Sequence, residues 1–434
     1  MGVGQGGGWS GLLVLGLLTA CHPPSARICS PPSQMYDPAP PRVGRTWLAR
    51  GGRIYGARPG TLGPIGGGKG HRKIVTRGNK RVKTLDGLIA ALKLATPGTV
   101  VFVDGRARID CTVRVLADGL VLEIPAGVTL ASDRGRSRGE GRGTSAGALI
   151  FSDTRATRPL IRAGGPGVRV TGLRLRGPDP KPRTDHHRRS FAEGRGHRYY
   201  YRYPVSVGIR TLHSRLLVDN CEVAGWSHAA IHLKAGQGHH IHHSYLHHNQ
   251  LRGLGYGVGL DRATALIEHN LFHYNRHSIA GTGRPGSGYE ARHNVELGRS
   301  VSHCFDLHGG ADRRDSTNVA GTWLKIHHNT FRACPRAIAI RGVPQRQARV
   351  HHNWFSHRGP AGAIYSEGNT RVYDNAYGVT RPRFSVTGVG RSITGFPRTD
   401  GGVVGHAVGP SARADRTIAR MVLRVIRSVG DPSR

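Results

Sequence analysis

Ile326-His327-His328-Asn329-Thr330-Phe331 and Val350-His351-His352-Asn353-Trp354-Phe355 are two copies of one short pattern in the second half of the chain. Five copies share an Asn at the same place, and two degenerate copies, at 218–223 and 241–246, precede them. Successive Asn residues are 24, 35, 24 and 22 positions apart. A β-rich, glycine-punctuated repeat of this length predicts a solenoid in which each repeat is one coil. The five Asn are Asn270, Asn294, Asn329, Asn353 and Asn375.

Stacked coils place equivalent residues in straight columns, about 4.8 Å apart from coil to coil. We expect the Asn column to lie inside a turn, where side-chain amides bond up and down the stack. The residue before each Asn is usually His, which predicts a second, solvated column of stacked rings on an outer edge. A strip of metal-binding histidines is the alternative for this column. Its members are His243, His269, His293, His328 and His352.

A further strand follows each turn, and its copies alternate apolar and polar residues with period two. The polar positions therefore form two outward-facing columns. Charged residues alternate there with Gly and Ala, which predicts an open strip that carries a few functional groups. One column reads Arg210, Lys234, Asp261, Thr282, His308, Arg341, Glu367, and the other reads Gly208, His232, Gly259, Ala280, Asp306, Ala339, Tyr365.

The net charge of +37 comes mostly from Arg. This excess favours an anionic partner, although a GC-rich genome that encodes basic residues as Arg would give the same composition. The chain has no arginine-rich helix, zinc-finger spacing or aromatic nucleic-acid signature, so we expect no nucleic-acid partner. We expect a monomer.

The N-terminal apolar run Leu12–Leu18 has the size of a signal peptide, although no Lys or Arg precedes it. It ends in Leu18-Thr19-Ala20-Cys21, which resembles a bacterial lipoprotein processing site with Cys21 as the lipidated residue. We therefore expect export to the cell envelope, with a lipid anchor as the sole membrane contact. Export also permits disulfides, and Cys304 and Cys334 are one coil apart. Cys221 occupies a ladder position and is expected to be a buried free thiol.

The chain divides into a signal segment at 1–21, a Pro/Gly/Arg-rich tether at 22–70, the solenoid at 71–380 and a tail or cap at 381–434. Residues 84–95 predict an amphipathic helix with Thr84 as its N-cap, placed to cover the open end of the solenoid. This helix leads into Ala95-Thr96-Pro97-Gly98-Thr99-Val100-Val101. Together with the Ile-x-x-Asn-x-Phe coils, this arrangement resembles the right-handed parallel β-helix of the pectate-lyase-like superfamily over residues 80–380. The resemblance implies an all-β fold with an N-terminal capping helix.

That fold carries lyases, hydrolases, epimerases and binding modules, so the activity must be argued from the strip. Asp306 and His308 lie two residues apart on one face, about 6–7 Å between Cα atoms. A neutral His308 as base, with Arg341 or Lys234 neutralising the developing charge, suits proton abstraction beside a carboxylate. This chemistry is that of a uronate lyase or C5-epimerase acting on an acidic polysaccharide.

Two alternatives remain open. Asp261 and Asp306, about 10 Å apart, could act as the carboxyl pair of an inverting glycoside hydrolase, but the cations around them would lower their pKa values and disfavour a general acid. The chain could also be a non-catalytic surface lipoprotein that binds glycan or metal.

Further residues complete the predicted site. His277 joins the catalytic group, because the polar residues 274–278 lead into a bare strand around Ala280. The predicted substrate-binding residues are Lys234, His232, Arg276, Arg284 and Tyr365. The insertion at 178–204 precedes the first strip strand and is expected to form a wall. A second insertion, at 309–321, leaves the strip directly after His308 and explains the 35-residue gap. The strip has few clustered carboxylates, so neither calcium, another metal nor a cofactor is expected.

Overall fold

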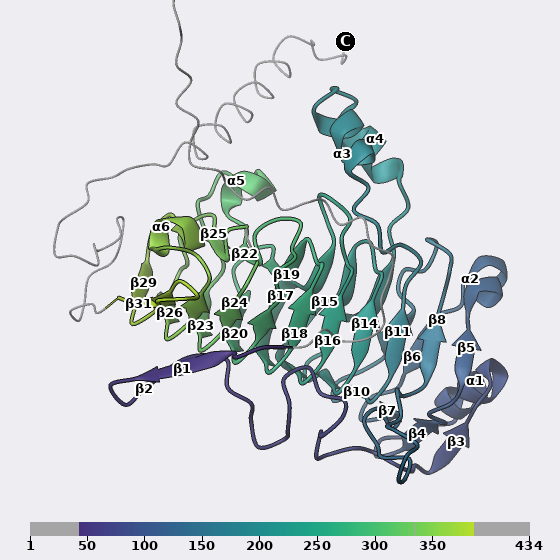
Figure 1. Ribbon diagram of the computed structural model, residues 1–434. Helices are drawn as coiled ribbons and strands as arrows, with labels where there is room; N and C mark the ends of the chain where they lie inside the picture. Colours follow the sequence, from purple (N-terminus) through teal and green to yellow (C-terminus); the bar gives the residue numbers. More distant parts are fainter. Residues whose placement is uncertain (1–42, 334, 386–434) are drawn as a thin grey trace, which may run out of the picture. The chain divides into compact units, whose positions relative to one another are not determined.

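The computed structural model describes residues 43–333 and 335–385, which all belong to one compact unit. Each coil contributes a strand to each of three parallel sheets (Figure 1). The first and second sheets are continuous, because β15 and β17 are long enough to run from one into the other. Antiparallel pairing occurs between β1 and β2 and between β30 and β31.

The strands fall into three sets. The first sheet holds β6 (Leu122–Ile124), β9 (Ile161–Ala163), β12 (Val207–Thr211), the starts of β15 (Ala229–His242) and β17 (Tyr256–Glu268), β19 (His277–Gly281), β22 (Phe305–Leu307), β25 (Ile338–Ile340) and β28 (Ile364–Ser366). The second holds β3 (Lys80–Val82), β4 (Val100–Val103), β7 (Thr129–Ala131), β10 (Arg169–Thr171), β13 (Leu217–Asp219), the ends of β15 and β17, β20 (Gly288–Arg292), β23 (Trp323–His327), β26 (Ala348–His351) and β29 (Thr370–Tyr373). The third holds β5 (Arg108–Asp110), β8 (Leu149–Phe151), β11 (Arg174–Arg176), β14 (Glu222–Ala224), β16 (Tyr245–His247), β18 (Leu271–His273), β21 (Val295–Glu296), β24 (Thr330–Phe331), β27 (Trp354–Phe355), β30 (Ala376–Tyr377) and β31 (Arg383–Phe384).

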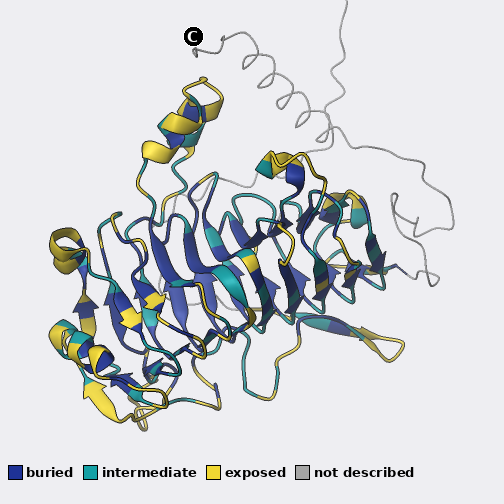
Figure 2. Cartoon of the chain, turned by 180° about the vertical axis from the view of Figure 1, so that it is seen from behind, coloured by how far each residue is buried: buried dark blue, intermediate teal, exposed yellow. Residues whose placement is uncertain are grey.

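Short helices interrupt the coils, and a hairpin of β1 (Trp47–Arg50) and β2 (Arg53–Gly56) precedes them. The helices are α1 (Leu85–Lys93), α2 (Thr112–Asp118), α3 (Thr184–Phe191), α4 (Gly196–Arg202), α5 (Gly310–Arg313) and α6 (Pro360–Ala363). Of these, α3 to α6 project from the side of the coils opposite to β1 and β2 (Figure 1). Buried residues follow the sheets, whereas exposed ones gather on the helices and the β1–β2 hairpin (Figure 2).

Helix α1 confirms the predicted helix and its cap. The Thr84 hydroxyl accepts a hydrogen bond from the backbone N–H of Gly87, which satisfies one of the free donors at the helix start. Leu88 and Leu92 are buried in the same apolar core as the first coils. The helix therefore covers apolar residues at the N-terminal end of the solenoid, as the sequence predicts.

The asparagine ladder is confirmed and is continuous. Each Asn side-chain oxygen accepts a hydrogen bond from the backbone N–H of the residue one coil before, at 2.9–3.0 Å from Ser244 to Asn353. Cys221 starts the ladder by donating its N–H to the Ser244 hydroxyl, and Ser385 ends it by accepting from Asn375. The buried thiol of Cys221 is free, as expected. Buried turn amides are thus paired along the whole stack.

The histidine column is stacked as predicted, with neighbouring ring centroids 4.8–5.2 Å apart. These five residues adopt left-handed backbone conformations, with φ between 46° and 55°, at the bend before the ladder Asn. The column is less solvated than predicted, because His243 is buried and the other four residues are only partly exposed. Residues 53–72 cover it: the Gly66 N–H donates to the His269 carbonyl, and the Tyr55 ring stacks on His352. The predicted tether is therefore packed against the coils in its described part, residues 43–70.

Several predictions concern residues outside the described ranges. These are the signal segment with Cys21, the pairing of Cys304 with Cys334, and the tail after residue 385. Within the described part of the chain, no helix is long and apolar enough to cross a membrane.

The ladder yields a stability prediction. Asn329 accepts from the backbone and side-chain N–H groups of Asn294 and donates to Ala291 and Asn353. Asn329→Ala should lower the unfolding free energy by about 2–4 kcal/mol, because buried partners on both sides lose their hydrogen bonds. Chemical denaturation measures this loss. The exposed Asn318→Ala serves as control, and its unfolding free energy should stay within about 0.5 kcal/mol of the wild type. Equal losses of unfolding free energy in the two variants would contradict a stabilising role of the ladder.

A second prediction concerns Glu296, which lies in the interior column between Phe272 and Phe331. Burial raises the pKa of Glu296 from 4.5 to about 8 and outweighs the opposing effect of the Ser278 hydroxyl. The folded state therefore keeps a proton that the unfolded state loses above pH 4.5. This contribution to stability is complete below pH 4.5 and falls as the pH rises to about 8, by roughly 1.4 kcal/mol per pH unit at most.

Glu296→Gln should remove this slope, whereas the exposed Glu140→Gln should keep it. Denaturation curves collected from pH 5 upward measure the difference between each variant and the wild type. An unchanged slope in Glu296→Gln would show that Glu296 titrates normally.

Candidate functional site

The strip on the first sheet has the predicted order over most of its length. Cα pairing aligns Gly259, Ala280, Asp306, Ala339 and Tyr365 on successive coils. The prediction is wrong at the first strand, where Arg210 pairs with His232 and not with Lys234. A shift of two residues keeps the same side chains facing outward, so the alternating pattern alone did not reveal the error.

Asp306 lies at the centre of the strip between two small residues. Ala280 and Ala339 precede and follow Asp306 in the column, so no bulky neighbour on the adjoining coils covers this position. Larger side chains from other columns converge on its carboxylate and leave it fully buried. We call this group the Asp306 cluster; it comprises Asp306, His277, His303, His308, Asp312 and Arg341.

Arg341 binds the Asp306 carboxylate through two parallel hydrogen bonds. Its Nε donates to Oδ1 at 3.0 Å and its Nη2 to Oδ2 at 2.8 Å. Nη1 of Arg341 donates to Asp312 at 3.1 Å. Burial alone would raise the pKa of Asp306, but Arg341 and the surrounding histidines outweigh burial and hold this pKa well below its ordinary value. Asp306 is therefore a buried anion throughout the neutral range.

His308 lies between two carboxylates. Its Nε2 is 2.8 Å from Asp306 Oδ2 and its Nδ1 is 3.4 Å from Asp312 Oδ2. Because ionised carboxylates only accept hydrogen bonds, both ring nitrogens of His308 act as donors. Burial lowers the pKa of His308, but the contacts with Asp306 and Asp312 outweigh it and leave this pKa above its ordinary value. The two carboxylate contacts favour the imidazolium form of His308 over the neutral base that the sequence analysis predicts.

His277 and His303 occupy one column with Tyr256 at the start of the strip strands. Their rings stack at 4.2 Å between His277 and His303 and at 5.9 Å between His277 and Tyr256. His303 Nε2 lies 3.1 Å from Asp306 Oδ1, and His277 Nε2 lies 3.7 Å from Asp306 Oδ2. Burial lowers the pKa of His277 well below its ordinary value, so its ring is neutral. Burial also raises the pKa of Tyr256.

Asp261 and its partners form a separate group farther along the strip. Lys234 Nζ lies 2.8 Å from Asp261, the Thr282 hydroxyl donates to it at 2.9 Å, and Arg284 Nε lies at 3.7 Å. Burial raises the pKa of Asp261, but the bonds from Lys234 and Thr282 outweigh burial and leave this pKa below its ordinary value. Both carboxylates of the predicted hydrolase pair are therefore ionised and engaged by cations.

The remaining predicted residues are more scattered. Arg276 lies over the Tyr256 ring at 5.9 Å, next to the Asp306 cluster. His232 is buried and its ring is 4.7 Å from that of His228. The Tyr365 hydroxyl donates to Glu367 at 2.9 Å, two coils beyond Asp306. The structure thus unites His308, Asp306, Arg341 and His277 and leaves the others along the strip.

The sequence analysis does not predict two members of the Asp306 cluster. Ile279 pairs with Phe305, so counting two residues back on each strand aligns His277 with His303, and an alignment extended upstream of Phe305 would have found it. Asp312 lies on α5, inside an insertion that carries no repeat signal. The two insertions also meet: Arg314 after α5 donates to His197 on α4 at 3.3 Å.

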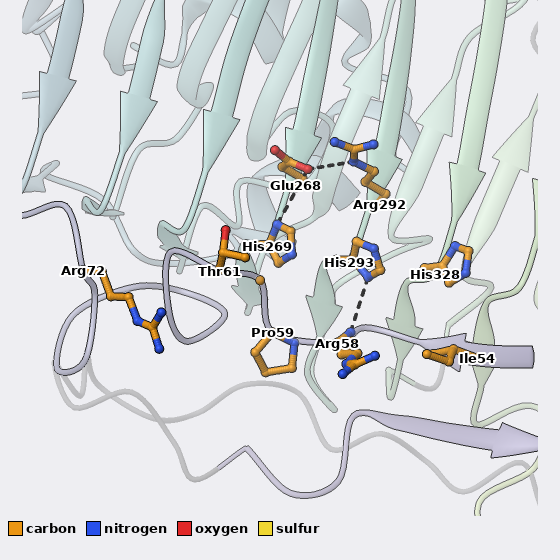
Figure 3. A pocket seen from close by; sticks show the side chains of 11 residues that line it. Ile54, Arg58, Pro59, Thr61, Arg72, Glu268, His269, Arg292, His293 and His328 are labelled. Carbon is orange, nitrogen blue, oxygen red and sulfur yellow. Dashed lines mark hydrogen bonds and ion pairs between the residues drawn. The ribbon is translucent and has the colours of Figure 1, made fainter.

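A pocket of about 680 Å³ lies at the histidine column, away from the Asp306 cluster (Figure 3). Its walls come from the covering segment, including Arg58 and Arg72, and from the column residues His269 and His293. Arg58 donates its backbone N–H to His293 Nδ1 at 3.4 Å. Arg292 is paired with Glu268 at 2.7 Å. This pocket lies beneath the covering segment, and its polar side chains include the ion pair of Glu268 with Arg292; it contains no residue of the Asp306 cluster.

Comparisons with known proteins address the fold. The model of a family described as the right handed beta helix region matches residues 206–377. No curated protein sequence matches the chain. Two solved structures are similar. An alginate lyase from Paenibacillus sp. str. FPU-7 has 15% identity and a TM-score of 0.41, over 67% of this chain and 98% of the lyase. The A-module of a mannuronan C-5 epimerase from Azotobacter vinelandii has 13% identity and a TM-score of 0.33, over 67% of this chain and 86% of the module.

The family match and the three parallel sheets agree with each other. The matched residues run from the start of β12 to the end of β30, which is the region of the asparagine ladder and the strip. The described coils therefore form a parallel β-helix, and the family match identifies residues 206–377 as its right-handed β-helix region.

Proposed function

We propose that this protein is an enzyme that acts on an acidic polysaccharide by removing a proton beside a uronate carboxylate, with β-elimination or C5-epimerisation as the outcome. One observation carries the proposal: Asp306 fixes Arg341 and the imidazolium of His308 side by side on a bare part of the strip. Both side chains keep exposed surface, 27% for Arg341 and 22% for His308.

Proton removal beside a carboxylate builds negative charge on that group. Cations that are already fixed in place stabilise such charge without reorganising during the reaction. Arg341 is suited to this role because its bidentate bond to Asp306 locks the guanidinium plane. The proton removed from the sugar carbon passes to solvent water on the open strip. His308 gives one proton back, to the leaving oxygen in an elimination or to the opposite face of the sugar carbon in an epimerisation, and is then reprotonated from solvent. Asp306 is a positioning residue, since it is fully buried.

The strip offers further cations for the other sugar units of a polyanion. Arg162 and Arg210 pair one coil apart, and Arg158 lies close enough that its charge, with burial, lowers the pKa of Arg210. Arg162 is paired with Glu123 at 2.6 Å, so a bound anion would chiefly stabilise the charges of Arg158 and Arg210. Lys234 and Arg284 add cations between these arginines and the Asp306 cluster. A polyuronate bound along the coils would contact positively charged side chains at several of its sugar units.

Hydrolysis is less well supported by the same geometry. An inverting hydrolase needs one protonated carboxyl as general acid. Asp306 and Asp261 are both bound by cations that lower their pKa values. Neither carboxyl is thus suited to donate a proton near neutral pH.

Incubation of the purified protein with a panel of uronic-acid and neutral polysaccharides tests the reaction class. Elimination would create a C4–C5 double bond with ultraviolet absorbance together with new reducing ends. Epimerisation would change the uronate composition by NMR without either signal. Reducing ends without the double bond would establish hydrolysis and contradict the proposal, and the absence of all three signals would favour a binding protein.

Variants of the two cations test the roles of the residues. Arg341→Lys keeps the charge but loses the bidentate geometry, so kcat should fall by about 10²–10³. His308→Gln keeps a hydrogen bond but cannot give up a proton, and its kcat should fall by about 10²–10⁴. Steady-state kinetics measure both effects. Arg349→Lys, an arginine on the second sheet, is the matched control. Unchanged kcat in both variants would place the chemistry elsewhere on the strip.

A further inference from the structure

We propose that His277, His303 and Asp306 bind a divalent transition-metal ion, with zinc as the first candidate. One nitrogen of each imidazole and one oxygen of the carboxylate lie within 4.8 Å of one another. Two imidazoles and a carboxylate are a ligand set that suits zinc and the metals close to it.

The hydrogen bonds of the two imidazoles point their Nε2 atoms at the cluster. His277 Nδ1 is 2.5 Å from the carbonyl oxygen of His303. A carbonyl only accepts, so Nδ1 carries the hydrogen and Nε2 is left to face Asp306. His303 also directs Nε2 at Asp306, at 3.1 Å, but donates a hydrogen bond to this carboxylate. Before it could bind an ion, its proton would have to move to Nδ1, which lies 3.4 Å from the Ser302 hydroxyl. Metal-binding histidines commonly show this arrangement, in which the second nitrogen donates to a carbonyl or another acceptor.

An unpartnered buried atom gives independent support. His277 is fully buried, and its Nε2 has no hydrogen-bond partner among the described residues. The distance of 3.7 Å from Nε2 to Asp306 Oδ2 is too long for a hydrogen bond. Tetrahedral zinc holds N and O ligands about 3.3 Å apart, given bonds of about 2.0–2.2 Å. The observed separations of 3.1 Å for His303 and 3.7 Å for His277 lie on either side of this value.

Asp306 can bind the ion and keep its hold on Arg341. A carboxylate accepts at about four lone-pair positions. Arg341 uses two of these, and His303 and His308 use one each. Ion binding would replace the contact from His303, so one position becomes free for the metal. Hydrogen bonds from Arg341 and His308 would then support the ligating carboxylate.

The ion would have an open position towards the strip. The His303 side chain is 22% exposed, whereas His277 and Asp306 lie beneath it. Three protein ligands with one open position are typical of sites that bind a substrate or water. A uronate carboxylate there would be polarised by the ion as well as by Arg341. This catalytic consequence rests on the proposed function, but the binding of the ion does not.

Metal titration of the purified protein tests the site. After chelator treatment, the protein should bind one equivalent of Co²⁺ or Zn²⁺ tightly, and bound Co²⁺ should show the visible absorbance of a four-coordinate centre. His303→Gln should weaken this binding by about 100-fold or more. The matched control His352→Gln lies in the histidine column and should bind as the wild type does. X-ray absorption of the zinc-loaded wild type should show two imidazoles and a carboxylate, without relying on any variant.

Three results would overturn the site. The wild type could bind no tight equivalent of metal ion, or His303→Gln could bind the ion with unchanged affinity. The third result is a loss of metal affinity confined to His352→Gln, which would assign the ion to the histidine column. Circular dichroism melts identify a variant that fails to fold, in which case the X-ray absorption spectrum decides. The two proposals can fail separately. Tight binding without turnover would leave the metal site standing, and turnover by protein that binds no ion would leave the proposed function standing.

Discussion

The hydrogen-bond ladder through the turn between the second and third sheets is the constraint on which the rest of the structure depends. It fixes each coil at one spacing from the next, because every ladder side chain accepts from the coil before it. Equivalent residues must then stack in columns. The stacked rings of the histidine column, the interior column of Phe331 and Phe355 and the strip on the first sheet all follow from this single repeat. Residues far apart in sequence, such as Asp306 and Arg341, become neighbours by the same rule.

The coil repeat explains why the fold and part of the site could be predicted from the sequence. Positions inside the repeat were placed by counting, so Asp306, His308 and Arg341 were brought together correctly. The prediction of contacts failed for residues that lie outside the repeat, because their positions cannot be obtained by counting coils. Asp312 comes from an insertion, and residues 53–72 cover the histidine column through contacts that no periodicity encodes. The two-residue shift at Arg210 shows a further limit, since an alternating pattern is unchanged by a shift of two.

The same histidine-rich composition serves two different purposes in this chain. Residues of the histidine column occupy left-handed bends, where His, Asn and Asp are more readily accommodated than most side chains. Their neighbours are other imidazoles and the covering segment. His277, His303 and His308 instead surround a carboxylate. The chemical environment, and not the number of histidines, therefore separates a structural column from a candidate reactive group.

Asp306 is the strongest sign that the strip was selected for chemistry. A stacked column needs only a small residue at this position, as Ala280 and Ala339 on the adjoining coils show. Burying a carboxylate is costly, and the surrounding ion pairs offset this cost only while every partner stays in place. Alanine at 306 would avoid the cost and leave the solenoid intact. This chain instead keeps a buried anion and arranges Arg341, His308 and His303 around it. The role of Asp306 is therefore to position these side chains and not to stabilise the fold.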